Sequence, residues 1–182
     1  MGYRSQVHLL FGMSSKSHLQ ELISVYRMLP AVQKHKTMEQ WDYHVEEKTK
    51  DMSRNFDIHY LHCHADDWKW YDEYEDVQAL QTIQDLGDKF WSERKFPFAY
   101  RLVRTGEDST DIEEYDNTTV SDEFAHFDTN EKGAKDAEDM TEFFQGLIYP
   151  YNNIEVNIKQ DVSEDEAEIN QLITILEEGE TK

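Results

Sequence analysis

This chain alternates segments typical of β-strands with stretches whose apolar residues have helical spacing. That alternation constrains most strongly what the chain can fold into. Residues 3–11 place apolar side chains at alternate positions, which predicts a strand with one buried face. Residues 56–65 and 98–105 are rich in aromatic and branched side chains and predict two further strands. Residues 112–119 follow a turn at Gly106 and predict the hairpin partner of the last of these strands.

Apolar residues at helical spacing fill the intervals between these strands. Ser14 or Ser15 can cap a helix that Pro30 terminates. Apolar residues between positions 38 and 45 recur at helical spacing and predict a second, looser helix. Those between positions 77 and 90 form the apolar stripe of a third helix.

After the hairpin the pattern changes to short helices in acidic sequence. Residues 122–145 predict two short helices, residues 154–158 a short strand, and residues 163–179 a capped amphipathic helix. Together the elements predict an α+β fold in a single domain of 182 residues. We expect a ferredoxin-like sandwich with an antiparallel sheet over residues 1–117, and an acidic helical C-terminal extension over residues 118–182 packed on it.

The charge of the chain is strongly negative and unevenly distributed. It has 18 Lys and Arg against 39 Asp and Glu, a formal net charge of −21. Residues 1–104 carry a net charge of −2, whereas residues 105–182 carry 4 basic and 23 acidic side chains and a net charge of −19. Such a field repels nucleic acids and anionic lipids and attracts basic protein surfaces. We therefore expect no direct binding to nucleic acid or membrane.

The sequence favours a cytoplasmic protein. It has no run of about 18 apolar residues, and its N-terminus lacks the apolar core of a signal peptide. The single cysteine, Cys63, can form no internal disulfide, which fits a reducing compartment. The oligomeric state is left open, a homo-oligomer included.

A group of histidines near the second predicted strand is the pattern closest to a metal site. His62 and His64 are two residues apart on a strand, so both project from one face and can share a zinc or nickel ion. His59, Cys63 and Asp66 lie nearby. No distant Cys or His pair completes a four-ligand set, so an ordinary solvated strand face is the favoured interpretation and no metal is predicted.

Other chemical motifs give weak signals. Residues 128–139 match a calcium-binding EF-hand loop in part, but Lys132 and Asp139 occupy two of its ligand positions, which favours an ordinary helix-loop-helix. The run of acids between Glu107 and Asp116 is typical of a solvated face rather than of a catalytic pair. No nucleophile elbow, phosphate-binding loop or zinc-protease motif occurs. We therefore predict a protein that is not an enzyme and has no cofactor.

An aromatic tract follows the second predicted strand, with Trp68, Trp70, Tyr71 and Tyr74 among acidic residues. Proteins that stack single-stranded bases combine aromatic residues with Lys and Arg, and here only Lys69 is basic. Burial against the following helix is the favoured interpretation, and an aromatic contact patch for another protein is the second.

Three segments carry a resemblance to a known family. They are residues 1–7 (Met-Gly-Tyr-Arg-Ser-Gln-Val), residues 69–79 (Lys-Trp-Tyr-Asp-Glu-Tyr-Glu-Asp-Val-Gln-Ala) and residues 98–108 (Phe-Ala-Tyr-Arg-Leu-Val-Arg-Thr-Gly-Glu-Asp). In this order they resemble small uncharacterised accessory proteins of tailed bacteriophages and prophages, over residues 1–117. The resemblance implies a phage accessory protein acting in the bacterial cytoplasm. It implies no residue roles, and residues 118–182 depart from the short ending usual in that family.

Two functional hypotheses follow. In the first, the chain is a non-enzymatic inhibitor that imitates DNA and occupies the basic nucleic-acid-binding surface of a host protein, such as a defence nuclease. A charge of −19 corresponds to roughly 32 Å of duplex, because duplex DNA carries one charge per ~1.7 Å. In the second, the chain is an interaction or regulatory module that binds a host protein through an aromatic and apolar patch, without DNA mimicry. The carboxylates predicted to contact the partner are Asp108, Asp111, Glu113, Glu114, Asp116, Asp122, Glu123, Asp136, Glu138, Asp139, Glu142, Glu164, Asp165 and Glu168.

Overall fold

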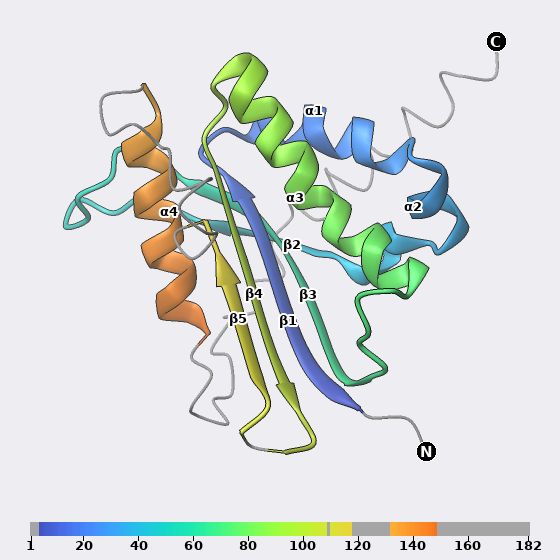
Figure 1. Cartoon of the computed structure of the whole chain (residues 1–182). Helices are drawn as coiled ribbons and strands as arrows, with labels where there is room; N and C mark the ends of the chain where they lie inside the picture. The colour runs from blue at the N-terminus through green and yellow to red at the C-terminus, as the bar shows by residue number, and fades with distance from the viewer. Residues whose placement is uncertain (1–3, 109, 118–131, 149–182) are drawn as a thin grey trace, which may run out of the picture.

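An antiparallel sheet of five strands with helices on both faces forms the centre of the structure (Figure 1). The computed structural model describes residues 4–108, 110–117 and 132–148. In chain order the elements are β1 (Ser5–Met13), α1 (Lys16–Arg27), α2 (Pro30–Lys34), the 3-10 helix η1 (Thr37–Gln40), β2 (Asp42–Glu46), β3 (Ile58–Trp68), α3 (Glu75–Arg94), β4 (Phe98–Gly106), β5 (Ile112–Asp116) and α4 (Ala134–Leu147). The strand order across the sheet is β2-β3-β1-β4-β5, and every neighbouring pair is antiparallel. The predicted α+β class and the antiparallel sheet are confirmed.

Most of the predicted elements that fall on the described residues are confirmed. The three predicted strands correspond to β1, β3 and β4, and the predicted hairpin partner corresponds to β5. Ser15 caps α1, because its Oγ accepts a hydrogen bond from the backbone N–H of His18. α3 and α4 lie where helical spacing predicted a helix. The elements predicted at residues 154–158 and 163–179, and the first of the two short helices expected after residue 122, lie outside the described residues.

The prediction of a looser helix between positions 38 and 45 is wrong. The chain forms the short helix η1 there and then the strand β2, which pairs with β3 so that Tyr43 lies opposite Leu61. Lys36, directly before η1, has a left-handed backbone conformation with φ of 51°. Backbone pairing with a strand distant in the sequence therefore outweighs a local helical spacing of apolar residues.

The first face of the sheet packs against α1, α2 and α3. Tyr26 of α1 donates a hydrogen bond from its hydroxyl to the carbonyl oxygen of Ala79 in α3, at 2.8 Å, and so joins the two helices. At Gly87 of α3 an added Cβ would lie 2.8 Å from the ring of Phe98, so only glycine allows α3 this close to the sheet. The core on this face includes Val7, Leu9, Phe11, Met13, Leu22, Leu61, Ile83 and Leu102.

The second face of the sheet packs against α4. Phe144 of α4 is fully buried and contacts Tyr60 of β3 with their rings edge to face. An added Cβ at Gly12 of β1 would lie 2.8 Å from the tip of the Phe144 ring, so this glycine makes room for the helix. The core on this face includes Leu10, Ile58, Tyr60, Ala99, Val103, Met140, Phe144 and Ile148.

Candidate functional site

In the β4–β5 hairpin, acidic residues that were predicted to bind a partner form ion pairs with two arginines of β4. Arg101 is only 2% exposed and donates to Asp116 at 2.9 Å and to Glu114 at 2.6 Å. Arg104 donates from both terminal nitrogens to the carboxylate of Asp111, at 3.1 and 2.8 Å. We call Arg101, Arg104, Asp111, Glu113, Glu114 and Asp116 the hairpin ion-pair cluster. Much of the negative charge of this segment is therefore neutralised within the molecule.

The predicted role of Asp116 in partner binding is wrong. This residue is 1% exposed, and its carboxylate accepts hydrogen bonds from Arg101 and from the side-chain amide of Gln145. It joins β5 to β4 and to α4 and cannot contact another protein. Glu114 and Asp111 are different, because their side chains remain 38% and 37% exposed beside the arginines.

The remaining predicted carboxylates after β4 differ in their surroundings. Asp108 is exposed, and hydrogen bonds from the backbone and side chain of Thr110 lower the pKa of its carboxyl. On α4, Lys135 lies 2.6 Å from the carboxylate of Asp139, which is 10% exposed. Glu138 also contacts Lys135, Glu142 is exposed, and Asp136 is half-buried, which raises the pKa of its carboxyl. Asp122, Glu123, Glu164, Asp165 and Glu168 lie outside the described residues.

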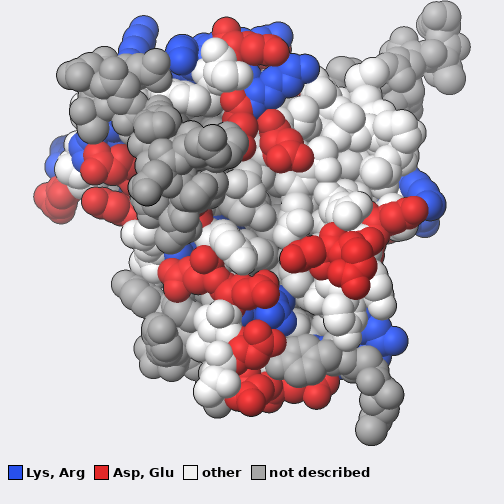
Figure 2. Space-filling view, viewed as in Figure 1, with Lys and Arg blue, Asp and Glu red and all other residues white. Residues whose placement is uncertain are grey.

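Carboxylates gather in several separate groups on the face shown in Figure 2, with neutral surface between them. Within the described residues there are 26 acidic and 16 basic side chains, a net charge of −10. The surface of the described residues is thus negative overall, but uncharged residues and ion pairs within the molecule interrupt it.

Among the described residues, four histidines lie on the second face of the sheet, and we call them the histidine face: His8, His44, His62 and His64. His8 of β1 and His62 of β3 share a hydrogen bond of 3.1 Å between ring nitrogens, in which one ring donates its N–H to the other. The ring of His8 also stacks on that of His64, with 4.2 Å between centroids. The sequence indicated His62 and His64 but missed His8 and His44, because only strand pairing brings them together.

The histidine face does not form a metal site in the described part of the chain. No group of three or more His, Cys, Asp or Glu side chains there is arranged to hold a metal ion. The parallel rings of His62 and His64 have centroids 6.0 Å apart, and His64 contacts the carboxylate of Asp66 at 2.9 Å. His59 faces the other side of the sheet, where it hydrogen bonds with the hydroxyl of Tyr43.

Burial keeps two of these histidines neutral at pH 7. It lowers the pKa of His8 to about 4, helped by the charge of His64 and opposed by that of Asp66. It lowers the pKa of His62 to about 3, with the other three histidines adding to the shift. An unfolded histidine has a pKa of 6.5, so below that pH the unfolded chain binds more protons than the folded chain. The stability that the neutral His8 and His62 contribute is therefore fully present above pH 6.5 and is lost as the pH falls.

We expect acidification from pH 7 to pH 5 to lower the free energy of unfolding by about 2 kcal/mol for each of His8 and His62. Urea denaturation at the two pH values measures this change. The double variant His8→Gln with His62→Gln should lose most of the pH dependence, whereas His35→Gln on α2's C-terminal side should keep it. A double variant with the native pH dependence would contradict this assignment.

A surface groove lies between α3 and the β4–β5 hairpin, with a volume of about 530 Å³, and we call it the α3–β5 groove. Its lining residues are Asp72, Gln78, Gln81, Thr82, Gln84, Asp85, Tyr100, Leu102 and Tyr115. The sequence predicted α3 from its apolar stripe alone and gave no sign of a groove along the polar side of that helix. Only the placement of α3 across the sheet brings these side chains together with Tyr115 of β5.

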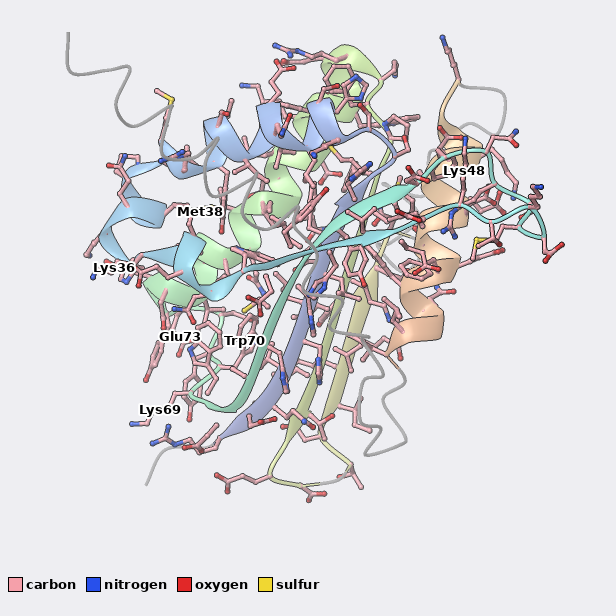
Figure 3. All side chains as sticks on the ribbon, turned by 180° about the vertical axis from the view of Figure 1, so that it is seen from behind. Lys36, Met38, Lys48, Lys69, Trp70 and Glu73 are labelled. Atoms are coloured by element: carbon pink, nitrogen blue, oxygen red, sulfur yellow. The ribbon has the colours of Figure 1, made fainter. Side chains whose placement is uncertain are left out.

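The aromatic tract after β3 is divided between core and surface. Trp70 is 5% exposed, which confirms the predicted burial for this residue, while Tyr74 is 41% exposed. Figure 3 shows Trp70 close to the sheet, with Lys69 and Glu73 at the edge of the molecule. A second hollow beside the tract is lined by Arg4, Gln40, Ala65, Asp67, Trp68, Lys69, Tyr74 and Asp76.

The segments that carry the phage-protein resemblance meet at this end of the sheet. Ser5 of β1 lies opposite Trp68 on one side and opposite Gly106 on the other. The backbone N–H of Arg4 donates to Glu107 at 2.9 Å, and its guanidinium donates to the carbonyl oxygen of Asp67 at 2.9 Å. Residues 1–7 therefore lie beside residues 98–108, and Arg4 lines the hollow beside the aromatic tract together with Lys69 and Tyr74 of the third segment.

The sequence matches no protein-family model, and neither a curated protein nor a solved structure matches it. Within residues 4–108, 110–117 and 132–148, no helix combines the length and apolar character that crossing a bilayer requires. Function must therefore be inferred from charge, burial and side-chain geometry.

Proposed function

We propose that this chain is a non-enzymatic phage accessory protein that binds a host DNA-binding or defence protein through its acidic surface and inhibits it in the host cytoplasm. The observation that carries the proposal is the negative charge, −21 for the chain and −10 for the described residues. A basic nucleic-acid-binding surface is the protein surface that such a field attracts most strongly. The α3–β5 groove adds support, because its charged lining side chains, Asp72 and Asp85, are both acidic.

The same proposal includes the finer description of the fold. The strand order β2-β3-β1-β4, with α1 leading from β1 towards β2 and α3 from β3 to β4, supports a ferredoxin-like unit. β5 and α4 would then be additions to that unit, one extending the sheet and the other covering its second face.

A second candidate function is a host-protein interaction module that uses an aromatic and apolar patch without imitating DNA. Two observations favour it. The carboxylates in Figure 2 form separate groups rather than one band, and those of the hairpin ion-pair cluster are held by Arg101 and Arg104. The hollow beside Trp68 and Tyr74 offers the aromatic surface that such a module needs.

An affinity experiment with the full chain separates the two candidates. The immobilised chain is incubated with a bacterial lysate at about 50 mM salt and then eluted with duplex DNA or with a salt gradient. We expect nucleic-acid-binding proteins to be released by DNA and by roughly 0.3 M salt, because affinity based on counterion release falls steeply with salt. Beads carrying polyglutamate of similar charge control for nonspecific retention of basic proteins.

A matched pair of double variants tests which acidic residues contribute to binding the partner. Glu138→Gln with Glu142→Gln removes two exposed charges of α4 and should lower the salt concentration needed for release. Glu47→Gln with Glu93→Gln removes two exposed charges elsewhere and should leave it unchanged. Partners that stay bound above about 1 M salt and are not released by DNA would contradict the proposal and favour the aromatic patch.

A further inference from the structure

β3 is longer than the strand that pairs with its outer side. It has 11 residues, whereas β2 has 5 and pairs only with Ile58–His62. Among the described residues, no strand pairs with the outer side of β3 from Cys63 to Trp68, and we call this segment the free edge of β3. Figure 3 shows this part of β3 leading down to Lys69, beyond the end of β2. Backbone groups on that side can hydrogen bond with a further strand.

The corresponding part of β4 is closed by a side chain. β4 also extends beyond its neighbour β5. There the side-chain amide of Asn117 accepts a hydrogen bond from the backbone N–H of Tyr100 and donates one to the carbonyl oxygen of Phe98 at 3.1 Å. On the free edge of β3, the one side-chain hydrogen bond to the backbone among the described residues runs from Arg4 to the carbonyl oxygen of Asp67. Of these two strand ends, that of β3 is therefore the more open to a further strand.

A bulge bounds the free edge. Ser5 of β1 lies opposite Trp68 but Val7 lies opposite Ala65, so β3 has one residue more than β1 between these pairs. Such a bulge bends the strand and interrupts regular pairing. The free edge therefore fits a short extended segment rather than a long strand.

Acidic side chains line the free edge on the second face of the sheet. Asp42 lies opposite His62, and Asp66 contacts His64, which places both carboxylates on this face. Both residues are exposed, and neither β2 nor β3 contains Lys or Arg. A segment added here therefore gains most from basic side chains on the same face.

On the first face of the sheet, a hollow adjoins the free edge. Its volume is about 450 Å³, and its lining includes Ala65, Trp68 and the ring of Tyr74, which is 41% exposed. Its lining contains two acidic and two basic side chains, and Arg4 lies 3.6 Å from Asp67. Because these charges balance and two aromatic rings remain, the hollow favours an apolar side chain over a charged one.

We propose that the free edge of β3 binds a short extended segment of a protein partner, in which basic side chains alternate with apolar ones. The inference rests on the proposed function and deepens it, since it names the element that holds the partner. Main-chain hydrogen bonds to β3 supply affinity, as is general for peptides bound by strand addition. Successive side chains of a strand point to opposite faces, so the basic ones meet Asp42 and Asp66 while the apolar ones enter the hollow.

The test uses the isotope-labelled full chain at about 50 mM salt and four peptides. The first, N-acetyl-Lys-Val-Lys-Val-Lys-amide, has the proposed alternation. The second has Glu in place of Lys, the third has Ser in place of Val, and the fourth is the first peptide with a methyl group on every backbone nitrogen. We expect the first peptide to bind at least about fivefold more tightly than the second and the fourth, and about threefold more tightly than the third.

Backbone amides show where the first peptide binds. In NMR spectra the amides of Asp42 and of residues 63–66 should shift when it is added. Those amides of residues 63–66 that face outward should also exchange with solvent at least about threefold more slowly. The amides of β5, at the other edge of the sheet, should neither shift nor gain protection.

Matched variants test the two faces separately. Asp42→Asn with Asp66→Asn should weaken binding of the first peptide at least about threefold, whereas Glu47→Gln with Glu93→Gln should change it less than about twofold. Tyr74→Ala should weaken it about threefold but leave binding of the serine peptide unchanged, and Tyr74→Phe should preserve both. The four acidic residues are exposed and the Tyr74 side chain makes no capping hydrogen bond, so these variants should fold, which a urea titration checks.

Three results would overturn the inference: equal binding of the glutamate or the N-methylated peptide, shifts centred outside β2 and β3, or binding that the Asp42 and Asp66 double variant does not weaken. Failure here is distinguishable from failure of the proposed function. If the first peptide binds as expected but the lysate yields no DNA-releasable protein, the strand-addition assignment stands and the host-partner proposal fails. If such proteins are captured but the first peptide leaves the amides of residues 63–66 unchanged, the strand-addition assignment fails.

Discussion

Replacement of Arg101 by methionine is expected to lower the free energy of unfolding by about 3–5 kcal/mol. The guanidinium of this residue is buried and donates to Asp116, to Glu114 and to the carbonyl oxygen of Ile148 at 3.0 Å. Without it, the buried carboxylate of Asp116 loses the guanidinium that donates to it, which is more costly than the loss of an exposed pair. Urea denaturation of the full chain measures the change.

Two further variants separate the buried charge from the exposed one. Glu114→Gln removes the partner that is 38% exposed and should cost less than about 1 kcal/mol. Arg101→Met combined with Asp116→Leu removes both buried charges and should recover much of the stability lost in the single variant. If Arg101→Met alone lowers the free energy of unfolding no more than Glu114→Gln does, Arg101 does not stabilise the fold.

Replacement of Phe144 by alanine is expected to cost about 3–5 kcal/mol, because it leaves a cavity between α4 and the sheet. Its ring is fully buried, lies against Gly12 and contacts Tyr60. The neighbouring Phe143 is only partly buried, so Phe143→Ala is the matched control and should cost clearly less. Urea denaturation gives the two values, and hydrogen exchange shows whether the amides of α4 lose protection first.

If Phe144→Ala and Phe143→Ala lower the free energy of unfolding equally, the buried ring of Phe144 does not hold α4 on the sheet. Loss of protection spread evenly over α3 and α4 would mean that the helix does not open separately from the rest of the fold. Either result would contradict the packing described for the second face of the sheet.

Local sequence patterns predicted the elements whose residues alternate or repeat over a long stretch. β1 and α3 are examples, since one face of each is consistently apolar. β2 was missed because it has only five residues and none of them is buried, so its strand conformation depends on pairing with β3.

The candidate site could be predicted only in part. The acids of β5 are visible in the sequence, but whether a carboxylate faces solvent or an arginine depends on the register between β4 and β5, which places Asp116 opposite Arg101. The same holds for the histidine face, where His8 and His62 are 54 positions apart. The α3–β5 groove arises from the position of a helix over a sheet, for which one sequence contains no local signal.

Within the described part of the chain, β2 and β5 are the two edges of the sheet, and each is five residues long. Edge strands expose unpaired backbone groups that invite a second molecule to add its own strand, which is a route to aggregation. Acidic residues lie at both ends of β2, and Glu113 and Glu114 are adjacent in β5. Those of β5 are paired with Arg104 and Arg101, but two copies that approached through the β2 edges would bring the acids at its ends together, so these charges disfavour self-association through that edge of the sheet.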